Sequence, residues 1–251
     1  GEYGEGKMSS PRQIFSYIEN YFNKRDLVKN KNFKAIVTAG PTREYLDPVR
    51  YISNESSGKQ GYEIALALKK LGIKTTLIIG PSAITYQNNI ETKKIVSAEE
   101  MLSEVKKSLP VDVAVCAAAV SDYKPTKKNK TKIKKNQKKL EFLELQKNID
   151  IAEFLGKTNK HRPKLVIGFA AETENLSKNA ILKLKQKNCD LIIANDISKK
   201  NSGFNSDFNK ISIIDNLGKI KIIKKNKKSY IANVITDIIL DKLLLDDRSF
   251  N

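Results

Sequence analysis

The 251-residue sequence lacks most features that mark membrane, secreted or metal-binding proteins. No apolar run approaches the roughly 18–20 residues that a membrane helix needs, and the first seven residues have no apolar core of a secretory signal. The two cysteines, Cys116 and Cys189, each lie in an apolar run and show no metal-binding spacing, which predicts buried free thiols rather than a disulfide. We therefore expect a cytoplasmic protein that does not enter a membrane.

Arginine and histidine are scarce in a chain that is nonetheless strongly basic. The formal net charge is +18, yet only six of the 46 basic residues are Arg, and the lysines are widely spread. Because base readout and paired phosphate contacts favour Arg, this composition indicates a general Lys/Asn bias or small anionic ligands rather than nucleic acid. The single histidine, His161, lies in a polar segment and is expected on the surface. No Cys–His or Ser–His pair, HExxH or CxxC motif indicates nucleophilic or metal-hydrolase catalysis.

Glycine and proline are also few, with 12 and 7 residues, while hydrophobic residues make up 40%. These values exclude wholesale disorder and collagen-like structure. The length suits one large α/β domain, or a domain with an appendage. Because the sequence begins at Gly1 without a methionine, we expect a fragment of a longer protein.

From Phe33 onward, strand-length and helix-length segments alternate. Apolar runs predict strands over residues 34–38, 75–79, 93–96, 111–118, 164–168 and 190–194. Helices are predicted over residues 58–71, 97–108, 175–188 and 229–245. Two further strands, 210–214 and 219–223, flank a turn signal and predict a hairpin. This order predicts a Rossmann-like α/β fold, with a mostly parallel sheet flanked by helices and a C-terminal β-hairpin.

Two segments depart from this alternation. The first is residues 125–145, which overlap a lysine-rich run with nine lysines between positions 124 and 139. This segment predicts a flap excursion, with a solvated charge run as the alternative. In residues 1–30, Ser9 or Ser10 can cap a helix that has Pro11 at its first position. The polar stretch 24–32 predicts a linker. We therefore divide the chain into residues 1–30 and a domain over residues 31–251.

Polar residues follow four of the predicted strands, and ligands of open α/β sheets bind at such strand ends. The turn after the first strand contains Gly40 but lacks the G-x-G-x-x-G fingerprint of dinucleotide-binding folds. Further on, Ser56, Ser57 and Gly58 precede a helix whose N-terminus suits an anion, although the segment is not a Walker A motif. Asn54 could hold an oxygen on which charge develops. An ordinary turn and a plain helix cap are the alternatives at these two places.

The other two strand ends suit a nucleotide. Ala117–Ala119 would let a flat ligand approach the backbone, and Asp122 could accept hydrogen bonds from a base or a ribose. Phe169 could stack on a ring or be a core aromatic, and Asn195 follows the next strand. If there is chemistry here, these residues indicate charge stabilisation around phosphates.

Taken together, these segments resemble a known ligase family. The match keeps the family's order through residues 38–61, 117–125, 132–135, 147–151, 168–175, 195–198 and 203–207. Residues 33–245 are similar to the phosphopantothenate–cysteine ligase (CTP-dependent phosphopantothenoylcysteine synthetase) domain of bacterial bifunctional coenzyme A biosynthesis flavoproteins. The resemblance implies that the carboxylate of 4′-phosphopantothenate attacks the α-phosphate of CTP, giving an acyl-cytidylate and pyrophosphate. The amine of L-cysteine then displaces CMP.

The resemblance also implies roles for individual residues. Asn54 would handle the acyl-cytidylate, and Lys132, on the flap, would be needed for turnover. The implied CTP-binding residues are Ala118, Ala119, Asp122, Lys132, Asn148, Ile149, Asp150, Ile151, Phe169, Lys183 and Lys187. Phosphate or substrate contacts are assigned to Gly40, Arg50, Ser56, Ser57, Gly58 and Lys59. Ile149 stands where the family usually has proline.

The resemblance further implies Mg²⁺ as the cofactor, with unassigned ligands, and a homodimer. Residues 1–11 resemble the tail of the preceding FMN-dependent decarboxylase domain, but the cysteine that would precede Gly1 is missing. We therefore expect FMN only in that absent domain and no decarboxylase activity here. An NAD(P)-binding oxidoreductase of the same fold class, a basic RNA-binding module and an inactive synthetase domain are the alternatives.

Overall fold

The protein is described by a computed structural model over residues 8–84, 90–134, 142–158, 160–172, 174–196 and 206–246. An eight-stranded sheet forms its centre. Its strands are β1 (Lys34–Ala39), β4 (Lys74–Ile79), β5 (Glu91–Lys94), β6 (Val113–Cys116), β9 (Leu165–Glu172), β10 (Leu191–Asp196), β11 (Phe208–Asp215) and β12 (Ile220–Lys227). Their spatial order is β12-β11-β10-β9-β6-β1-β4-β5. The pairs β12–β11 and β11–β10 are antiparallel, and the other neighbouring pairs are parallel. This confirms the predicted mostly parallel sheet and its C-terminal hairpin.

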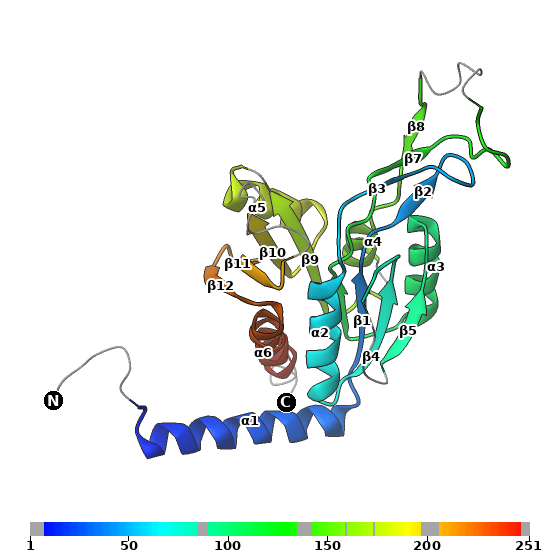
Figure 1. Ribbon diagram of the computed structural model, residues 1–251. Coiled ribbons are helices and arrows are strands. Elements are labelled where there is room, and N and C mark those ends of the chain that lie inside the picture. Colours follow the sequence, from blue (N-terminus) through cyan, green and yellow to red (C-terminus); the bar gives the residue numbers. More distant parts are fainter. Residues whose placement is uncertain are drawn as a thin grey trace.

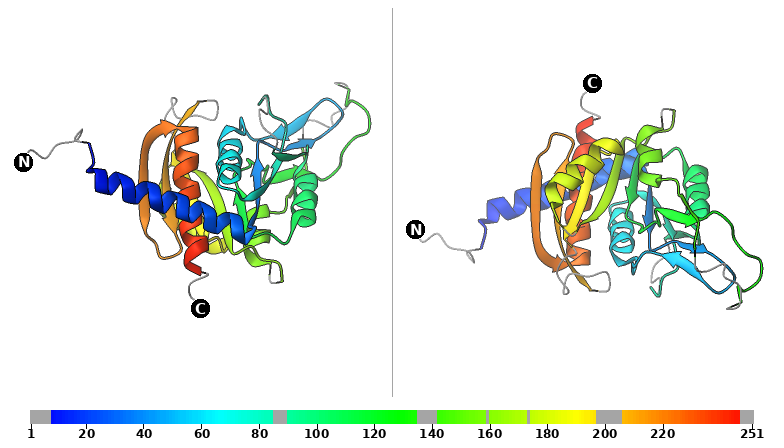
Figure 2. Two further views of the ribbon diagram at one scale, coloured as in Figure 1. Left: turned by 90° about the horizontal axis from the view of Figure 1, so that it is seen from below. Right: turned by 90° about the horizontal axis from the view of Figure 1, so that it is seen from above.

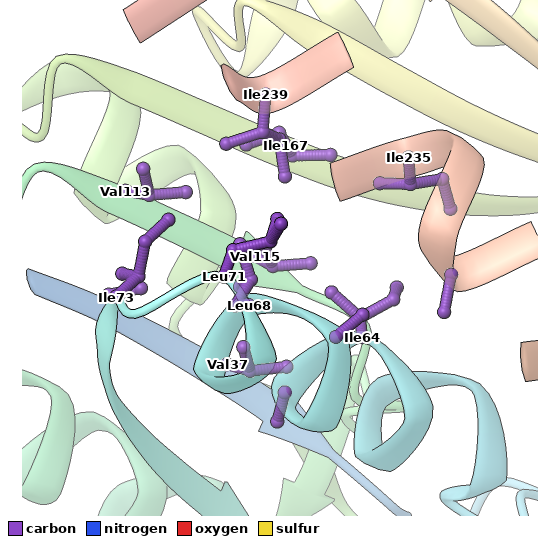
Figure 3. Close-up of a cluster of buried hydrophobic side chains, with 14 of the residues drawn as sticks. Val37, Ile64, Leu68, Leu71, Ile73, Val113, Val115, Ile167, Ile235 and Ile239 are labelled. Atoms are coloured by element: carbon purple, nitrogen blue, oxygen red, sulfur yellow. The ribbon is translucent and has the colours of Figure 1, made fainter. Parts of the chain in front are cut away.

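Helices cover both faces of the sheet (Figures 1 and 2). α2 (Lys59–Lys70) and α6 (Lys228–Asp246) pack against each other on one face. α3 (Ala98–Ser108), α4 (Ile151–Lys157) and α5 (Leu176–Gln186) lie on the other. Successive strand residues face opposite ways, so Val37 packs under α2 while Ile36 packs in the core on the other face. Figure 3 shows the first of these cores, to which α2 contributes Ile64 and α6 contributes Ile235.

The strand order places a switch point beside β1. The chain leaves β1 through α2 and pairs β4 on one side of it, whereas β6 pairs on the other side and continues to β9 and β10. At such a point the connections leave the carboxyl ends of two adjacent strands in opposite directions and open a crevice between them. The fold therefore places a ligand site at the carboxyl ends of β1 and β6.

Two small antiparallel pairs extend beyond this edge of the sheet (Figure 1). β2 (Arg43–Tyr45) pairs with β3 (Tyr51–Ser53), and β7 (Tyr123–Pro125) pairs with β8 (Leu145–Lys147). The predicted flap excursion is confirmed as the connection between β7 and β8, which we call the arm. Residues 135–141 of the arm, including Lys135, lie outside the described residues.

The predicted linker is wrong, because residues 24–31 are the second half of a helix. α1 (Pro11–Lys31) begins at the predicted cap Ser10, whose hydroxyl accepts the N–H of Gln13 at 3.3 Å, and ends at Asn32 with a φ of 50°. The polar stretch contains no proline or glycine that would stop a helix. Its end is tied to the domain by Val28, which is fully buried. Residues 1–7, which carry the resemblance to a decarboxylase tail, lie outside the described residues.

Cys116 and Cys189 are free thiols, as predicted, but only Cys189 is buried, whereas Cys116 is half-buried. His161 is exposed, as predicted. Across the described ranges, no helix combines the length and apolar character that crossing a membrane requires.

Candidate active site

A cavity of about 450 Å³ opens at the carboxyl edge of the sheet, at the switch point beside β1. Three loop segments line it, residues 54–61, 116–122 and 148–152, together with residues 169–171 at the end of β9. Of the 18 positions predicted for the site, 15 lie in the lining: Asn54, Ser56, Ser57, Gly58, Lys59, Ala118, Ala119, Asp122, Asn148, Ile149, Asp150, Ile151, Phe169, Lys183 and Lys187. The remaining predicted residues, Gly40, Arg50 and Lys132, are not among the lining residues.

The first wall is the loop that leads into α2. Gly58 has a φ of 76°, and a Cβ at this position would come within 3.2 Å of the Cα of Gly40. The two glycines thus let the loop pack directly on the end of β1, which explains why Gly40 supports the cavity from below instead of lining it. The hydroxyl of Ser57 accepts the N–H of Lys59 at 3.4 Å, so the serine side chain lies at the first turn of the helix.

The second wall, residues 116–122, is held against the first by hydrogen bonds. The N–H of Ala117 donates to Thr38 O at 3.1 Å and that of Ala119 to Gly40 O at 2.9 Å. Asn54 Nδ2 then donates to Val120 O at 2.9 Å and links the two walls across the cavity. Small side chains on this wall leave its backbone accessible to a flat ligand, as the sequence predicted.

The third wall carries a fixed ion pair. Asp150 caps α4 by accepting the N–H of Glu153 at 3.0 Å and pairs with Lys187 Nζ at 2.8 Å. Burial alone would raise the pKa of Asp150, but its hydrogen bonds with Lys187 and the backbone lower it overall. Burial would lower the pKa of Lys187, and Asp150 outweighs this and raises it. Both groups are therefore charged at neutral pH.

Lys183, in the last turn of α5, and Lys187, the residue that caps this helix, both line the cavity, as their spacing predicted. Lys183 Nζ lies 2.7 Å from Glu172 Oε1, just as Lys187 pairs with Asp150. Each ammonium has three donors, so a carboxylate partner still leaves donors for a ligand. The ion pairs hold both cations in place at the rim.

Arg50 has a different place from the predicted one. Its guanidinium Nη1 lies 2.8 Å from Asp47 Oδ2 and 3.1 Å from Ile133 O. Asp47 Oδ2 also accepts the N–H of Ile133 at 3.2 Å, so Arg50 and Asp47 anchor the arm to the hairpin of β2 and β3. Lys132, next to Ile133, is exposed on this anchored segment.

The anchor gives a prediction for stability. Asp47 is fully buried, and burial alone would raise its pKa, but the N–H groups of Val49, Arg50 and Ile133 and the charge of Arg50 lower it below its usual value. A carboxylate with a lowered pKa in the folded state stabilises the fold above its unfolded pKa and loses that effect as the pH falls. Asp47→Asn is therefore expected to lower the unfolding temperature at neutral pH, and by less below about pH 4.

Circular-dichroism melts across this pH range measure the difference between variant and wild type. The exposed Asp26 provides the matched control, because Asp26→Asn should leave the unfolding temperature nearly unchanged at each pH. A destabilisation by Asp47→Asn that is equal at acidic and neutral pH would show that the charge of Asp47 is not what stabilises the anchor.

Sequence reasoning missed several cavity residues. Lys228, at the start of α6, and Asn209, in β11, line the cavity together with Gln60 and Cys116. A lysine in a lysine-rich stretch gives no signal of its own, and the closing helix was predicted to begin one residue later. Burial raises the pKa of the Cys116 thiol well above its usual range, so this group is neutral and is not an activated nucleophile.

The lining offers single carboxylates rather than a metal cage. Glu55, Asp122 and Asp150 lie in it, and in the part of the chain that is described no three His, Cys, Asp or Glu residues gather as metal ligands. Such a lining fits a Mg²⁺ ion that is held mainly by substrate phosphates, with one or two carboxylates added.

The fold and the site define an α/β domain that binds its ligand at the switch point of a doubly wound sheet. The sequence profile of the DNA/pantothenate metabolism flavoprotein C-terminal domain matches residues 30–243, and the chain belongs to this family.

A relative from Haemophilus influenzae, the coenzyme A biosynthesis bifunctional protein CoaBC, is 39% identical over 240 residues, which are 95% of this chain and 59% of the relative. The chain thus spans about three fifths of that protein. A crystal structure of the C-terminal domain of CoaBC is similar with a TM-score of 0.70 and 34% identity, covering 86% of this chain and 96% of that domain. A Cab2 mutant in complex with phosphopantothenate-cysteine has a TM-score of 0.67 over 97% of both chains, and at 16% identity it shows a likeness of fold.

Proposed function

We propose that this chain catalyses the CTP-dependent ligation of 4′-phosphopantothenate to L-cysteine through an acyl-cytidylate. The observation that supports this most is the cavity at the switch point. It brings Asn54, Asp122, the loop 148–151 and the α5 lysines to one place from segments spread over much of the chain. These are the segments on which the family resemblance rests.

The third wall is suited to the nucleoside of CTP. The Asn148 amide donates to Ser121 O at 2.9 Å, and Asn148 N donates to Asp122 O at 2.8 Å, so the loop 148–151 and the second wall form one rigid corner. Asp122 is exposed into this corner and can accept hydrogen bonds from a base or ribose. Phe169, half-buried at the end of β9, supplies an aromatic face beside it.

The cationic groups of the cavity are suited to the phosphates. Lys183 and Lys187 lie at the nucleoside corner, and the first turn of α2 with Lys59 lies on the first wall. Positive side chains and a helix N-terminus attract anions, so together they offset the repulsion between two polyanionic substrates. Mg²⁺ carried by the triphosphate would further neutralise charge on the phosphate under attack, with Asp122 or Glu55 as protein ligands.

A carboxylate resists attack by an amine until one of its oxygens belongs to a good leaving group. In the proposed reaction the carboxylate of phosphopantothenate attacks the α-phosphorus of CTP, the bond to the pyrophosphate breaks, and the acyl-cytidylate forms. The amine of cysteine then attacks the acyl carbon, CMP leaves, and the amine gives up a proton. Asn54, which links the first two walls, is placed to hold an oxygen of this intermediate.

The proposal covers the ligase alone. The relatives are bifunctional proteins, and this chain spans 59% of the one from Haemophilus influenzae. We further propose that the chain acts as a homodimer, as the family resemblance implies.

The proposed function predicts a strong nucleotide preference. With phosphopantothenate, cysteine and Mg²⁺ present, CTP should release pyrophosphate much faster than ATP, because the corner formed by Asp122 and the loop 148–151 suits a pyrimidine with an exocyclic amine. A coupled pyrophosphate assay measures both rates, and mass spectrometry identifies the amide product. Equal rates with CTP and ATP, or no amide product with CTP, would overturn the proposal.

A further inference from the structure

The first turns of α2 and α6 meet at one end of the cavity. The two helices pack side by side, as Figure 1 shows, and their first residues, Lys59 and Lys228, both line the cavity. Gln60 Nε2, in the first turn of α2, donates to Lys228 O in the first turn of α6 at 3.2 Å. The N–H of Lys228 donates to Asp207 O at 2.9 Å, and Lys59 Nζ lies 2.7 Å from Asp207 Oδ1. Residues 207–209 thus join the two helix ends into one corner.

This corner places positive side chains at two helix N-termini, where the helix dipoles disfavour them. Each helix begins with a lysine and has no acidic residue in its first turn, although the positive end of the helix dipole disfavours a cation there. α3 and α4 follow the rule, with Glu99, Glu100 and Glu153 in their first turns. α1 and α5, like α2 and α6, have no acidic residue in their first turns, so this corner is set apart because two helix starts, each with a lysine, lie side by side at the cavity.

The burial of Lys228 adds to this cost. Its residue is only 7% exposed, yet it lines the cavity together with Lys59 and with Asn209, which is also 7% exposed. Burial lowers the pKa of Lys228, and the nearby charge of Lys59 lowers it further, against the opposing effect of Asp207. Among the described residues of this corner, Asp207 is a carboxylate that both Lys59 and Lys228 face, and the two helix N-termini add positive potential beside it.

An anion in the cavity would lower the free energy of holding these cations at the helix N-termini and of burying Lys228. We propose that Lys228, with Lys59 and the first turns of α2 and α6, binds the two phosphates of CTP that leave as pyrophosphate. This inference rests on the proposed function for the identity of the nucleotide. A pyrophosphate group matches the corner better than a phosphate monoester, because it carries more negative charge to set against two cations and two helix ends. When the bond to the α-phosphate breaks, the same groups would stabilise the negative charge that develops on the leaving pyrophosphate.

The test compares Lys228→Gln with Lys227→Gln, a matched control because Lys227 is an exposed neighbour on β12 that does not line the cavity. In titration calorimetry with inorganic pyrophosphate, the affinity of Lys228→Gln should be lower than that of the wild type by roughly tenfold or more, and the affinity of Lys227→Gln should be near that of the wild type. Steady-state assays should show a comparable rise in the KM for CTP, with the KM for phosphopantothenate changed less than twofold. Lys228→Arg, which keeps the charge, should recover most of the pyrophosphate affinity.

Several outcomes overturn the inference. Unchanged pyrophosphate affinity in Lys228→Gln does so, and so does a rise in the KM for phosphopantothenate alone, which would assign the corner to the 4′-phosphate. If Lys228→Gln does not fold, Lys59→Gln tests the same corner through an exposed side chain and should weaken pyrophosphate binding. Binding of pyrophosphate needs no turnover, so a wild type that binds it through Lys228 yet makes no amide with CTP would leave the pyrophosphate site standing and overturn the proposed function, and with it the assignment of the site to CTP.

Discussion

Lys132→Gln is expected to lower the rate of ligation about 100-fold or more, the scale on which loss of one charge-stabilising donor slows a reaction. Glutamine keeps much of the length of the side chain but removes its charge. Lys132 is exposed, whereas its neighbour Ile133 is buried and anchored by Asp47 and Arg50. The substitution should therefore leave the unfolding temperature unchanged.

The loss is expected in kcat more than in the KM for CTP. Lys132 is not among the residues that line the cavity of the free chain, so we expect its ammonium to contribute to the reaction rather than to the first binding of CTP. Lys130→Gln is the control, because Lys130 is an exposed residue of the same segment outside the cavity lining. Wild-type turnover by the Lys132 variant would remove this residue from the mechanism.

The sheet and its order of helices could be predicted because their signals are local. β1, β6 and β10 are short apolar runs, and α2 and α3 have apolar residues at helical spacing. Local signals were weaker where the structure differs. β2, β3, β7 and β8 have only three residues each, too few for a pattern to emerge, and α4 has seven. Polar composition alone did not distinguish a linker from the second half of α1.

For a similar reason, the Ser97-x-x-Glu100 pattern at the start of α3, which is typical of a capping box, forms only half of one. Ser97 Oγ accepts the N–H of Glu100 at 3.2 Å, as expected, but the Glu100 carboxylate accepts the N–H of Val96 at 2.8 Å instead of that of the cap residue. A single bond to a neighbouring amide changes the motif without changing the helix. Sequence spacing identifies such a cap but not which of two adjacent amides the side chain takes.

For the site, sequence reasoning worked where function follows from strand ends. Asn54, Asp122 and Asn148 were placed by order along the chain and by family resemblance, and the cavity contains all three. It failed where contacts join distant segments through packing. Arg50 meets the carbonyl of Ile133, 83 residues away, and Lys228 reaches the cavity only because α6 packs on α2. Neither contact leaves a pattern in the sequence.

The second large effect is expected for Asn54→Asp, because this change removes a donor and adds a negative charge at the same atom. Asn54 Nδ2 donates to Val120 O at 2.9 Å and so holds the first wall against the second. An ionised aspartate cannot donate, and it would face both that carbonyl and the negative oxygens of the acyl-cytidylate. Its charge opposes the oxyanion that forms when the amine of cysteine attacks, so amide formation should slow by roughly 100- to 1000-fold.

Asn54→Ala separates the two causes, since alanine removes the donor without adding charge. If repulsion dominates, Asn54→Ala should retain more activity than Asn54→Asp; if the lost donor dominates, the two variants should be equally slow. With all substrates present, mass spectrometry should detect acyl-cytidylate in the Asp variant, because the step that consumes it is the one that slows. Amide formation at the wild-type rate in Asn54→Asp would show that the cavity stabilises the intermediate without this residue, and the assignment of the reaction centre would pass to the opposite wall, where Lys183 and Lys187 are held by their carboxylate partners.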